Sequence, residues 1–345
     1  MFNYFSKDLG IDLGTANSLV YVKDRGIVLS EPSLAAVNLK TNQVLAIGEE
    51  ARKMVGRTPV HISVIRPLLN GVISDFEMTE EMLRYFFKRT AGNRLMNFFR
   101  AVVGVPTNLT EVERKSVEDA VLSAGAAKAY LIEEPVAAAL GARLPIDEPT
   151  ANMIVDIGGG TTEIAILSMG GVVTARSLKV AGDKLNDDVI KFVRDEYKLA
   201  IGEPTAEELK VMIGSALPLD ERLEFAIRGR DMATGLPREV LVKGTQVRAA
   251  LQRSVRTIVE TIKEVIESAP PELVGDILRQ GIYLSGGGSL LRGMDALIHR
   301  EIGVRVSVVE DPLTCVVRGT GVAAEDIERY RHLFALSPKP AEINI

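Results

Sequence analysis

Residues Asn152 to Leu167 read NMIVDIGGGTTEIAIL, and this stretch decides the fold that the sequence predicts. Two β-prone runs flank an aspartate, three glycines and two threonines, a pattern typical of a β-hairpin with a polar tip. Glycines lack a Cβ, so backbone N–H groups can approach an anion closely, and Asp156 could hold a cation. An ordinary glycine-rich turn explains the same residues, because short glycine motifs often occur without a ligand.

A second copy of the pattern, earlier in the chain, favours a binding function. Residues Leu9 to Val22 (LGIDLGTANSLVYV) again place an aspartate, one apolar residue and a glycine between two β-prone runs. Asp12 and Asp156 lie 144 positions apart (156 minus 12). A duplication is the simplest explanation, and it predicts two related domains that face each other. Neither copy has the spacing of a P-loop or of a GxGxxG dinucleotide motif, so both of those nucleotide folds are disfavoured.

Composition restricts the classes of function further. The chain has 345 residues, of which 46% are hydrophobic and 25% charged, as expected for about two globular domains. A net charge of -5 gives no overall attraction to nucleic acid, so we expect no nucleic-acid partner. The single cysteine, Cys315, excludes an internal disulfide and is expected in the core. The three histidines, His61, His299 and His332, lack the spacing of metal ligands.

No part of the sequence predicts a membrane-spanning or secretory segment. An apolar run of about 18 residues is absent, and the residues before the first predicted strand are too few for a secretory signal. We therefore expect a cytoplasmic protein.

Strand, loop and helix alternate between the two hairpins. Residues 101–106 predict a buried strand, and Thr110 with Glu113 forms a capping box for the helix that follows. Residues 129–132 predict another strand, after which a helix opens at Glu133-Glu134-Pro135. Acidic residues next to a proline suit a helix N-terminus, which explains both glutamates structurally. The alternation predicts an α/β fold.

The second half of the chain contains a turn-rich insertion and a second glycine turn. Within residues 201–244, Glu207 and Lys210 are spaced to form an exposed ion pair on a short helix. A long amphipathic helix is expected over 245–268. A strand at 280–284 then enters the turn 285–291 (SGGGSLL), where a flat ligand could lie against backbone.

Five of these features occur in the order of the actin-like ATPase superfamily: the two hairpins, the Glu-Pro helix opening, the second glycine turn and a Gly-Thr-Gly helix at 316–323. Within that superfamily the sequence resembles the bacterial actin homologues over nearly its full length. The matching segments are 12–18 (DLGTANS), 27–33 (IVLSEPS), 65–74 (IRPLLNGVIS), 132–141, 156–163, 270–273 and 284–293.

The resemblance implies an α/β fold with two duplicated core domains, each carrying a smaller inserted subdomain, and a nucleotide in the cleft between them. The first core domain would comprise residues 1–31, 72–145 and 316–345, with its insertion at 32–71. The second core domain would comprise residues 146–181 and 245–315, with its insertion at 182–244.

The resemblance also implies ATP and Mg²⁺ as cofactors. Asp12 and Asp156 would orient the metal ion through its water shell. The first hairpin would contact the phosphates from one side and the second hairpin from the other, while two further segments would contact the base, the ribose and the rest of the adenosine. The implied ATP-contacting residues are Thr15, Ala16, Asn17, Gly158, Gly159, Gly160, Thr161, Glu207, Glu208, Leu209, Lys210, Gly287, Gly288, Ser289 and Leu290.

For hydrolysis, the resemblance implies that Glu134 orients the attacking water and that Thr161 is the second polar partner. The expected activity is slow ATP hydrolysis coupled to the state of a polymer. The implied partners are further copies of the chain, the inner face of the cytoplasmic membrane and the cell-wall elongation machinery, in a role that determines rod shape. A small-molecule kinase of the same fold, acting on a sugar or an acid, is the alternative.

Two aromatic clusters are candidates for membrane contact, because exposed apolar groups flanked by cations suit an anionic lipid surface. Proteins that the chain resembles bind membranes through these two regions. Packing into the core or against a neighbouring subunit would explain the clusters equally. The residues concerned are Met1, Phe2, Tyr4, Phe5, Leu95, Met96, Phe98 and Phe99.

Overall fold

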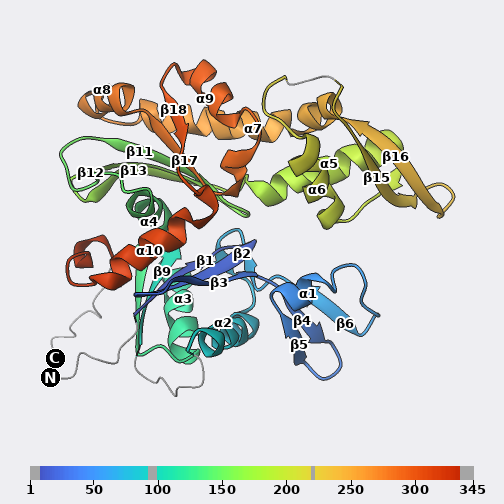
Figure 1. The fold of residues 1–345 in the computed structure, drawn as a ribbon, viewed down its shortest axis with the longest axis horizontal. Coiled ribbons are helices and arrows are strands. Elements are labelled where there is room, and N and C mark those ends of the chain that lie inside the picture. Colours follow the sequence, from blue (N-terminus) through green and yellow to red (C-terminus); the bar gives the residue numbers. More distant parts are fainter. Residues whose placement is uncertain (1–7, 92–98, 219–221, 335–345) are drawn as a thin grey trace.

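Each of the two hairpins lies at the centre of a five-stranded sheet in the computed structural model, which describes residues 8–91, 99–218 and 222–334 (Figure 1). In spatial order, the first sheet contains β10 (Lys128–Glu133), β9 (Arg100–Val105), β1 (Leu9–Leu13), β2 (Asn17–Val22) and β3 (Gly26–Pro32). The second sheet contains β13 (Gly171–Leu178), β12 (Thr162–Ser168), β11 (Asn152–Ile157), β17 (Ile282–Ser285) and β18 (Val306–Val308).

The two sheets share one topology. In the first, β1 runs antiparallel to β2 and parallel to β9, while β3 and β10 form the edges. In the second, β11 runs antiparallel to β12 and parallel to β17, while β13 and β18 form the edges. The duplication predicted from the two aspartate–glycine patterns is therefore present in the fold.

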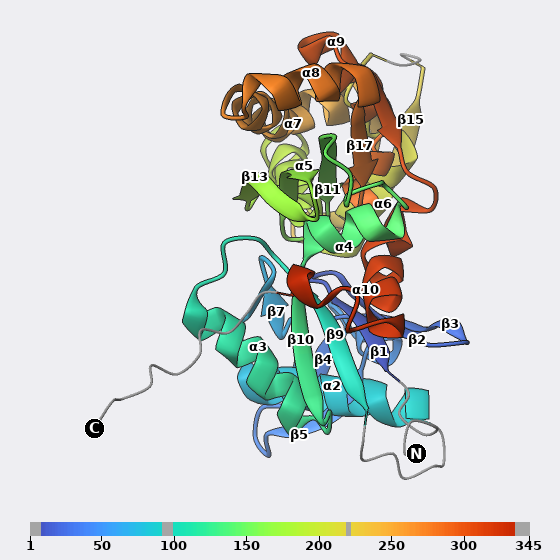
Figure 2. The same cartoon turned by 90° about the vertical axis from the view of Figure 1, so that its left-hand side faces the viewer.

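Helices cover both sheets and fill the space between them. The first sheet carries α2 (Phe76–Ala91) and α3 (Glu111–Ser123), and we call this unit the first lobe. The second sheet carries α7 (Gly244–Glu267), α8 (Pro271–Gln280) and α9 (Met294–Ile302), and we call this unit the second lobe, while α5 (Gly182–Tyr197) packs against α7 and against α6 (Glu203–Ile213). Two helices, α4 (Glu134–Gly141) and α10 (Cys315–Glu325), lie between the lobes (Figure 2).

The helices α4 and α10 pack closely because glycines face the neighbouring backbone. A Cβ on Gly319 would collide with the carbonyl of Ala137, and a Cβ on Gly141 would collide with that of Cys315. The core around these helices includes side chains from both sheets, such as Val102 and Ile154. Cys315 is buried there, and its thiol donates to the Ala138 carbonyl. The lobes therefore share one apolar core at this point.

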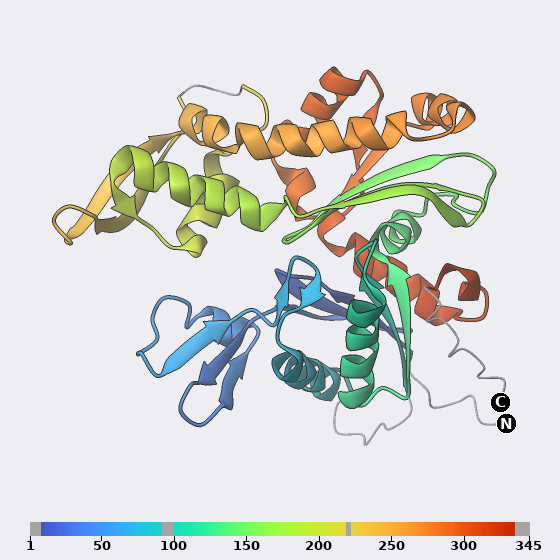
Figure 3. The same cartoon turned by 180° about the vertical axis from the view of Figure 1, so that it is seen from behind.

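A smaller unit extends from each lobe, and both units lie at the same end of the molecule (Figure 3). One contains β4 (Ala35–Asn38), β5 (Gln43–Ile47), α1 (Glu49–Arg52) and β6 (Ile62–Ile65). The other contains β14 (Leu199–Ala200), α6 (Glu203–Ile213), β15 (Glu224–Asp231) and β16 (Pro237–Lys243). The short elements between or after these units are β7 (Leu68–Leu69), β8 (Val72–Ile73), η1 (Gly287–Leu290), η2 (Pro312–Thr314) and η3 (Arg331–Leu333). The small sheets fall inside the ranges expected for insertions, while the domain boundaries themselves stay predictions.

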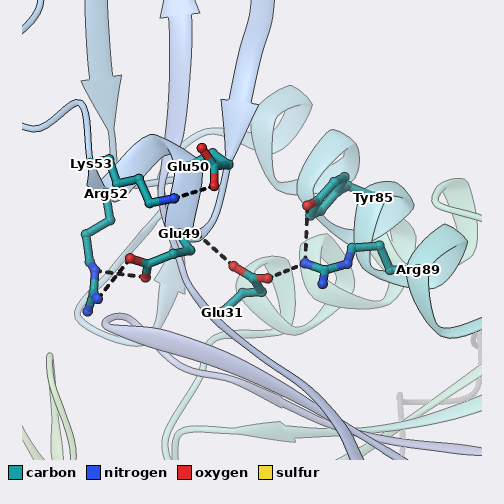
Figure 4. A network of polar contacts seen from close by, with 7 residues as sticks. All are labelled: Glu31, Glu49, Glu50, Arg52, Lys53, Tyr85 and Arg89. Carbon is teal, nitrogen blue, oxygen red and sulfur yellow. Dashed lines mark hydrogen bonds and ion pairs between the residues drawn. The ribbon is translucent and has the colours of Figure 1, made fainter.

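A polar network attaches the first small unit to α2 (Figure 4). Glu31, at the end of β3, accepts a hydrogen bond of 2.7 Å from the backbone N–H of Glu49. Its other carboxylate oxygen pairs with Arg89, which also donates to the Tyr85 hydroxyl. Since Glu31 is buried, these donors replace the water that its charge would lose on folding.

Several local predictions are confirmed, and others are wrong or incomplete. Thr110 and Glu113 form the predicted capping box, and α7 lies where the long amphipathic helix was expected. The edge strand β13 and the helix α8 were not predicted. The turn after β17 forms the short helix η1, and α9 begins only at Met294.

The expectation that Phe99 contacts a membrane is wrong. Its side chain is 5% exposed, and its ring packs edge-on against Phe87 with 4.9 Å between the centroids. The other candidates for membrane contact, Met1, Phe2, Tyr4, Phe5, Leu95, Met96 and Phe98, lie outside the described residues. Within the described part of the chain, every helix is too short or too polar to cross a bilayer.

Candidate functional site

The tips of the two hairpins meet between the lobes. The first tip comprises residues 14–16, between β1 and β2, and the second tip comprises residues 158–161, between β11 and β12. An ideal Cβ on Gly159 would lie 2.7 Å from the Cβ of Ala16, and one on Gly160 would lie 2.5 Å from the hydroxyl of Thr15. Any side chain on either glycine would therefore push the tips apart. The sequence predicted that these glycines admit a ligand; the structure adds that they allow two parts of the chain to approach each other.

The second tip is held from its carbonyl side. The N–H of Gly158 donates to the Thr161 carbonyl at 2.9 Å and closes the turn. The first two residues of α5, Gly182 and Asp183, donate to the carbonyls of Gly158 and Gly159 at 3.1 and 2.8 Å. The helix start thereby fixes the orientation of the peptide groups in the tip.

Four carboxyl groups are concentrated behind the tips. Burial and, to a smaller extent, the nearby charge of Asp156 together raise the pKa of Asp12 to about 7. Burial also raises the pKa of Asp156 to about 6. The pKa of Glu134 lies well above its ordinary value because of burial and because of the charges of Glu163, Asp12 and Asp156. Such a concentration of like charges favours the binding of a cation.

The carboxylates fit a hydrated magnesium ion better than a directly caged metal. One oxygen of Asp156, Oδ1, is buried without a hydrogen-bond partner. Among the described residues, no group of three or more histidine, cysteine, aspartate or glutamate side chains is arranged to hold a metal ion directly. Magnesium prefers oxygen ligands and retains several waters, so Asp12 and Asp156 suit it as outer partners.

The predicted water-orienting glutamate lies within this cluster. Glu134 is the first residue of α4, and Pro135 follows it as the sequence suggested. Its side chain is buried near Gly104 of β9. Glu133 is the N-cap and makes no capping hydrogen bond with its side chain. The other carboxylates of the site raise the pKa of Glu134, whereas the pKa of Glu133 is raised by burial alone.

The pair on α6 departs from the solvated surface pair that spacing alone suggested only at Lys210, because the Glu207 side chain is 49% exposed. Lys210 donates to Glu207 at 2.7 Å, but its side chain is only 11% exposed and also donates to the Gly182 carbonyl at 3.3 Å. Asn186 of α5 donates to Glu207 at 2.7 Å. Because Gly182 also bonds the second tip, the α6 pair is one residue removed from the site.

The two residues between this pair have different surroundings. Glu208 is exposed, whereas the side chain of Leu209 is buried in the core of the second lobe. Their assignment to ATP contact stays a prediction.

The second glycine turn packs against the same end of β11. A Cβ on Gly288 would collide with the side chain of Ile157. Gly286, with φ of 78°, donates its N–H to the Pro312 carbonyl at 3.0 Å. The Ser289 hydroxyl donates to the Gly286 carbonyl at 2.6 Å, while Leu290 is 53% exposed. The structure thus brings this turn beside the second tip.

Sequence reasoning missed two groups at the site. Arg66 donates to the backbone carbonyl of Thr15 at 3.4 Å and pairs with Glu203 of α6, so it links the first hairpin tip to the smaller unit of the second lobe. Glu163 is buried behind the second tip, directly opposite Asp156 in the β11–β12 ladder. Both residues lie in segments that match the resembled proteins, but nothing in their spacing indicated these contacts.

Comparison with known proteins places the chain among bacterial cell-shape proteins. The family model described as MreB/Mbl protein matches residues 6–332. The chain is 48% identical over 325 residues to the cell shape-determining protein Mbl of Bacillus subtilis, covering 94% of this chain and 98% of that protein. It is 47% identical over 331 residues to the cell shape-determining protein MreB of Escherichia coli, covering 94% and 95%. The solved structure of MreB5 of Spiroplasma citri bound to ADP superposes with a TM-score of 0.90, at 38% identity, over 95% of this chain and 98% of that one. A structure of the same protein bound to AMPPNP gives the same values.

Proposed function

This chain belongs to the MreB/Mbl family of actin-like proteins that determine cell shape, and from that premise we propose that it is an ATPase whose filaments lie on the inner face of the cytoplasmic membrane. The observation that carries the proposal is the meeting of the two hairpin tips in front of a buried carboxylate cluster. MreB5, which shares the fold, is bound to ADP or AMPPNP in its structures.

In this proposal the two tips hold the phosphates of ATP. Backbone N–H groups of Gly159 and Gly160 and the hydroxyls of Thr15 and Thr161 lie at the tips as donors, and such donors suit phosphate oxygens. Asp12 and Asp156 hold magnesium through water, and the bound ion supplies positive charge beside the phosphates. The α6 pair and the turn 287–290 contact the nucleoside.

Hydrolysis requires a water molecule held in line with the terminal phosphate. We assign to Glu134, which is buried beside the other carboxyl groups of the site, the role of accepting a hydrogen bond from that water and so directing the water's lone pair at the phosphate. Thr161, at the second tip, is the other polar group that contacts the water. In this proposal turnover is slow and is coupled to the state of the polymer.

The kinase alternative receives no support from the family match. A kinase would need a second substrate with a hydroxyl or carboxylate acceptor, and added small molecules would then accelerate ATP consumption. We therefore retain the cytoskeletal proposal, with the cell-wall elongation machinery as the partner on the membrane.

The proposal is tested by electron microscopy of the purified chain with Mg²⁺ and ATP, ADP or no nucleotide, on lipid monolayers of anionic composition. We expect filaments with ATP, attached to the lipid, and few or none without nucleotide. The matched variant replaces Phe2, Phe5 and Phe98 by serine and leaves Phe99 unchanged, because Phe99 belongs to the core. We expect this variant to form filaments with ATP that do not attach to lipid.

The two arms of the experiment have separate outcomes. Absence of filaments under every condition would contradict the assembly proposal. Equal attachment of the parent and the serine variant would contradict membrane contact through the aromatic clusters and leave the ATPase proposal standing.

A further inference from the structure

Glu163 is a fully buried carboxylate that receives hydrogen bonds from both lobes. Its exposed fraction is 0%. The Ser177 hydroxyl donates to Oε1 at 2.6 Å, and the backbone N–H of Thr107 donates to Oε2 at 3.1 Å. The Thr107 hydroxyl donates to Oε2 as well. A buried charge is tolerated only where such donors replace water.

These donors differ in origin. Ser177 lies on β13 and is the direct ladder partner of Glu163, so its hydrogen bond stays within the second sheet. Thr107 lies between β9 and α3, in the first lobe, and it is 56 residues away in sequence. The contact between Thr107 and Glu163, which we call the interlobe clasp, therefore crosses from one lobe to the other.

The clasp closes a ring of contacts around the hairpin tips. Pro106, beside Thr107, packs against Gly71, where a Cβ would collide with the proline ring. The N–H of Gly71 donates to the Thr15 hydroxyl at 2.9 Å. Thr15 in turn faces Gly160 of the second tip, three positions before Glu163. A shift of one lobe against the other must therefore disturb the clasp, the tips, or both.

The clasp also offsets a local repulsion. Asp156 and Glu163 are directly opposite each other on β11 and β12, where like charges destabilise a sheet. Thr107 supplies two of the hydrogen bonds that Glu163 accepts, whereas Ser177 supplies its hydrogen bond from within the second sheet. If the lobes separate, Glu163 loses those two donors and keeps its unfavourable neighbour. The energy of the carboxylate thus depends on the distance between the lobes.

We propose that Glu163 is a positioning residue that couples closure of the lobes to the placement of Thr161 at the second tip. Glu163 follows Thr161 by two positions in the same hairpin. The hydrogen bonds from Thr107 fix the Glu163 carboxylate, and this in turn restricts the position of the adjacent Thr161. This inference rests on the proposed ATPase function. It assigns to Thr107 a role in the reaction although the residue lies outside every segment of the resemblance.

The test compares three single variants of the full chain. Thr107→Val removes the hydroxyl that crosses the lobes and keeps the shape and the backbone N–H. Thr107→Ser restores a hydroxyl. Ser177→Ala removes a hydroxyl from the same carboxylate but from within the second sheet, so it controls for the loss of a hydrogen bond as such. Phosphate release at saturating ATP and ATP affinity are measured for each.

We expect Thr107→Val to lower phosphate release by about tenfold, the size expected for one hydrogen bond to a charged group. ATP affinity should change by less than about threefold, because the substitution does not touch the nucleotide. Thr107→Ser should recover most of the rate, and Ser177→Ala should lose much less than Thr107→Val. Equal rates for Thr107→Val and Ser177→Ala would overturn the proposal.

A second measurement does not depend on hydrolysis. Hydrogen exchange of the nucleotide-free chain follows the segments 106–110 and 158–163. We expect Thr107→Val to accelerate exchange in both segments and Ser177→Ala to accelerate it only in the second; unchanged exchange in Thr107→Val would overturn the clasp. A parent chain that releases no phosphate would contradict the proposed function, and the exchange result would still decide the clasp.

Discussion

Replacing Glu134 by alanine is expected to slow ATP turnover by about 100-fold or more while ATP still binds. The carboxyl group is buried at the start of α4 and belongs to the cluster formed with Asp12, Asp156 and Glu163. Without it, no acceptor at that position would orient the water, and catalysis of phosphoryl transfer depends on such positioning. Thr161→Ala should lower turnover to a similar extent.

The measurement is phosphate release under single-turnover conditions, together with ATP affinity. The matched control is Glu133→Ala, because Glu133 precedes Glu134 at the N-cap and makes no capping hydrogen bond with its side chain. We expect the control to stay within about threefold of the parent, because Glu133 is half-buried next to Glu134 and its side chain makes no capping hydrogen bond that the substitution would remove. Unchanged phosphate release in Glu134→Ala would exclude Glu134 as the residue that orients the attacking water.

Replacing Asp12 by asparagine is expected to abolish magnesium-dependent turnover and, at the same time, to stabilise the nucleotide-free chain. Burial and the charge of Asp156 raise the pKa of Asp12 to about 7. A carboxyl whose pKa is raised on folding favours the folded state at low pH and loses that contribution as pH rises toward the folded value. The parent should therefore lose stability between about pH 4 and pH 7. The asparagine side chain carries no charge in this range, so the stability of the variant should fall less than that of the parent.

Thermal unfolding with a chelator, at pH 5 and pH 8, measures the second effect. We expect Asp12→Asn to melt above the parent by about 2 °C or more at pH 8, with a smaller difference at pH 5. In the presence of Mg²⁺ and ATP, the order should reverse, because the parent gains the stabilisation of the bound ligand and the variant does not. An unaffected magnesium dependence of turnover in the variant would exclude Asp12 as a metal-orienting group.

Features set by neighbouring residues could be predicted from the sequence. The hairpins, the capping box at Thr110 and the helix opening at Pro135 depend on residues within a few positions of each other, and their chemistry is visible in a short window. The duplicated topology was predicted because the same short aspartate–glycine pattern occurs twice in the sequence. The order of these short patterns along the chain resembled that of actin-like proteins and predicted an actin-like fold, which the structure confirms.

Contacts between distant segments could not be predicted in this way. The aromatic run near 98–99 gave no sign that Phe99 turns into the core against Phe87, because burial depends on where α2 and β9 come together. Lys210 looked like a surface residue until α5 was placed beside it. Glu163 and Thr107 carry no motif of their own, and only the approach of the two lobes makes them partners.

The glycines of the second tip illustrate the same limit. Their number suggested close approach of a backbone to a ligand, and that expectation concerns only local geometry. The structure adds that Gly159 and Gly160 face Ala16 and Thr15. The two lobes can therefore touch here only because neither glycine has a Cβ. A phosphate held at this point would touch both lobes at once, and the state of the nucleotide would then act on the angle between them.

The central claim is that the two hairpin tips form one phosphate site, and a structure of the chain determined with AMPPNP and Mg²⁺ tests it most directly. The account predicts phosphates in contact with residues 15–17 on one side and 158–161 on the other, with the metal ion facing Asp12 and Asp156. Nucleotide bound away from the tips, or phosphates that touch only one of the two hairpins, would contradict it.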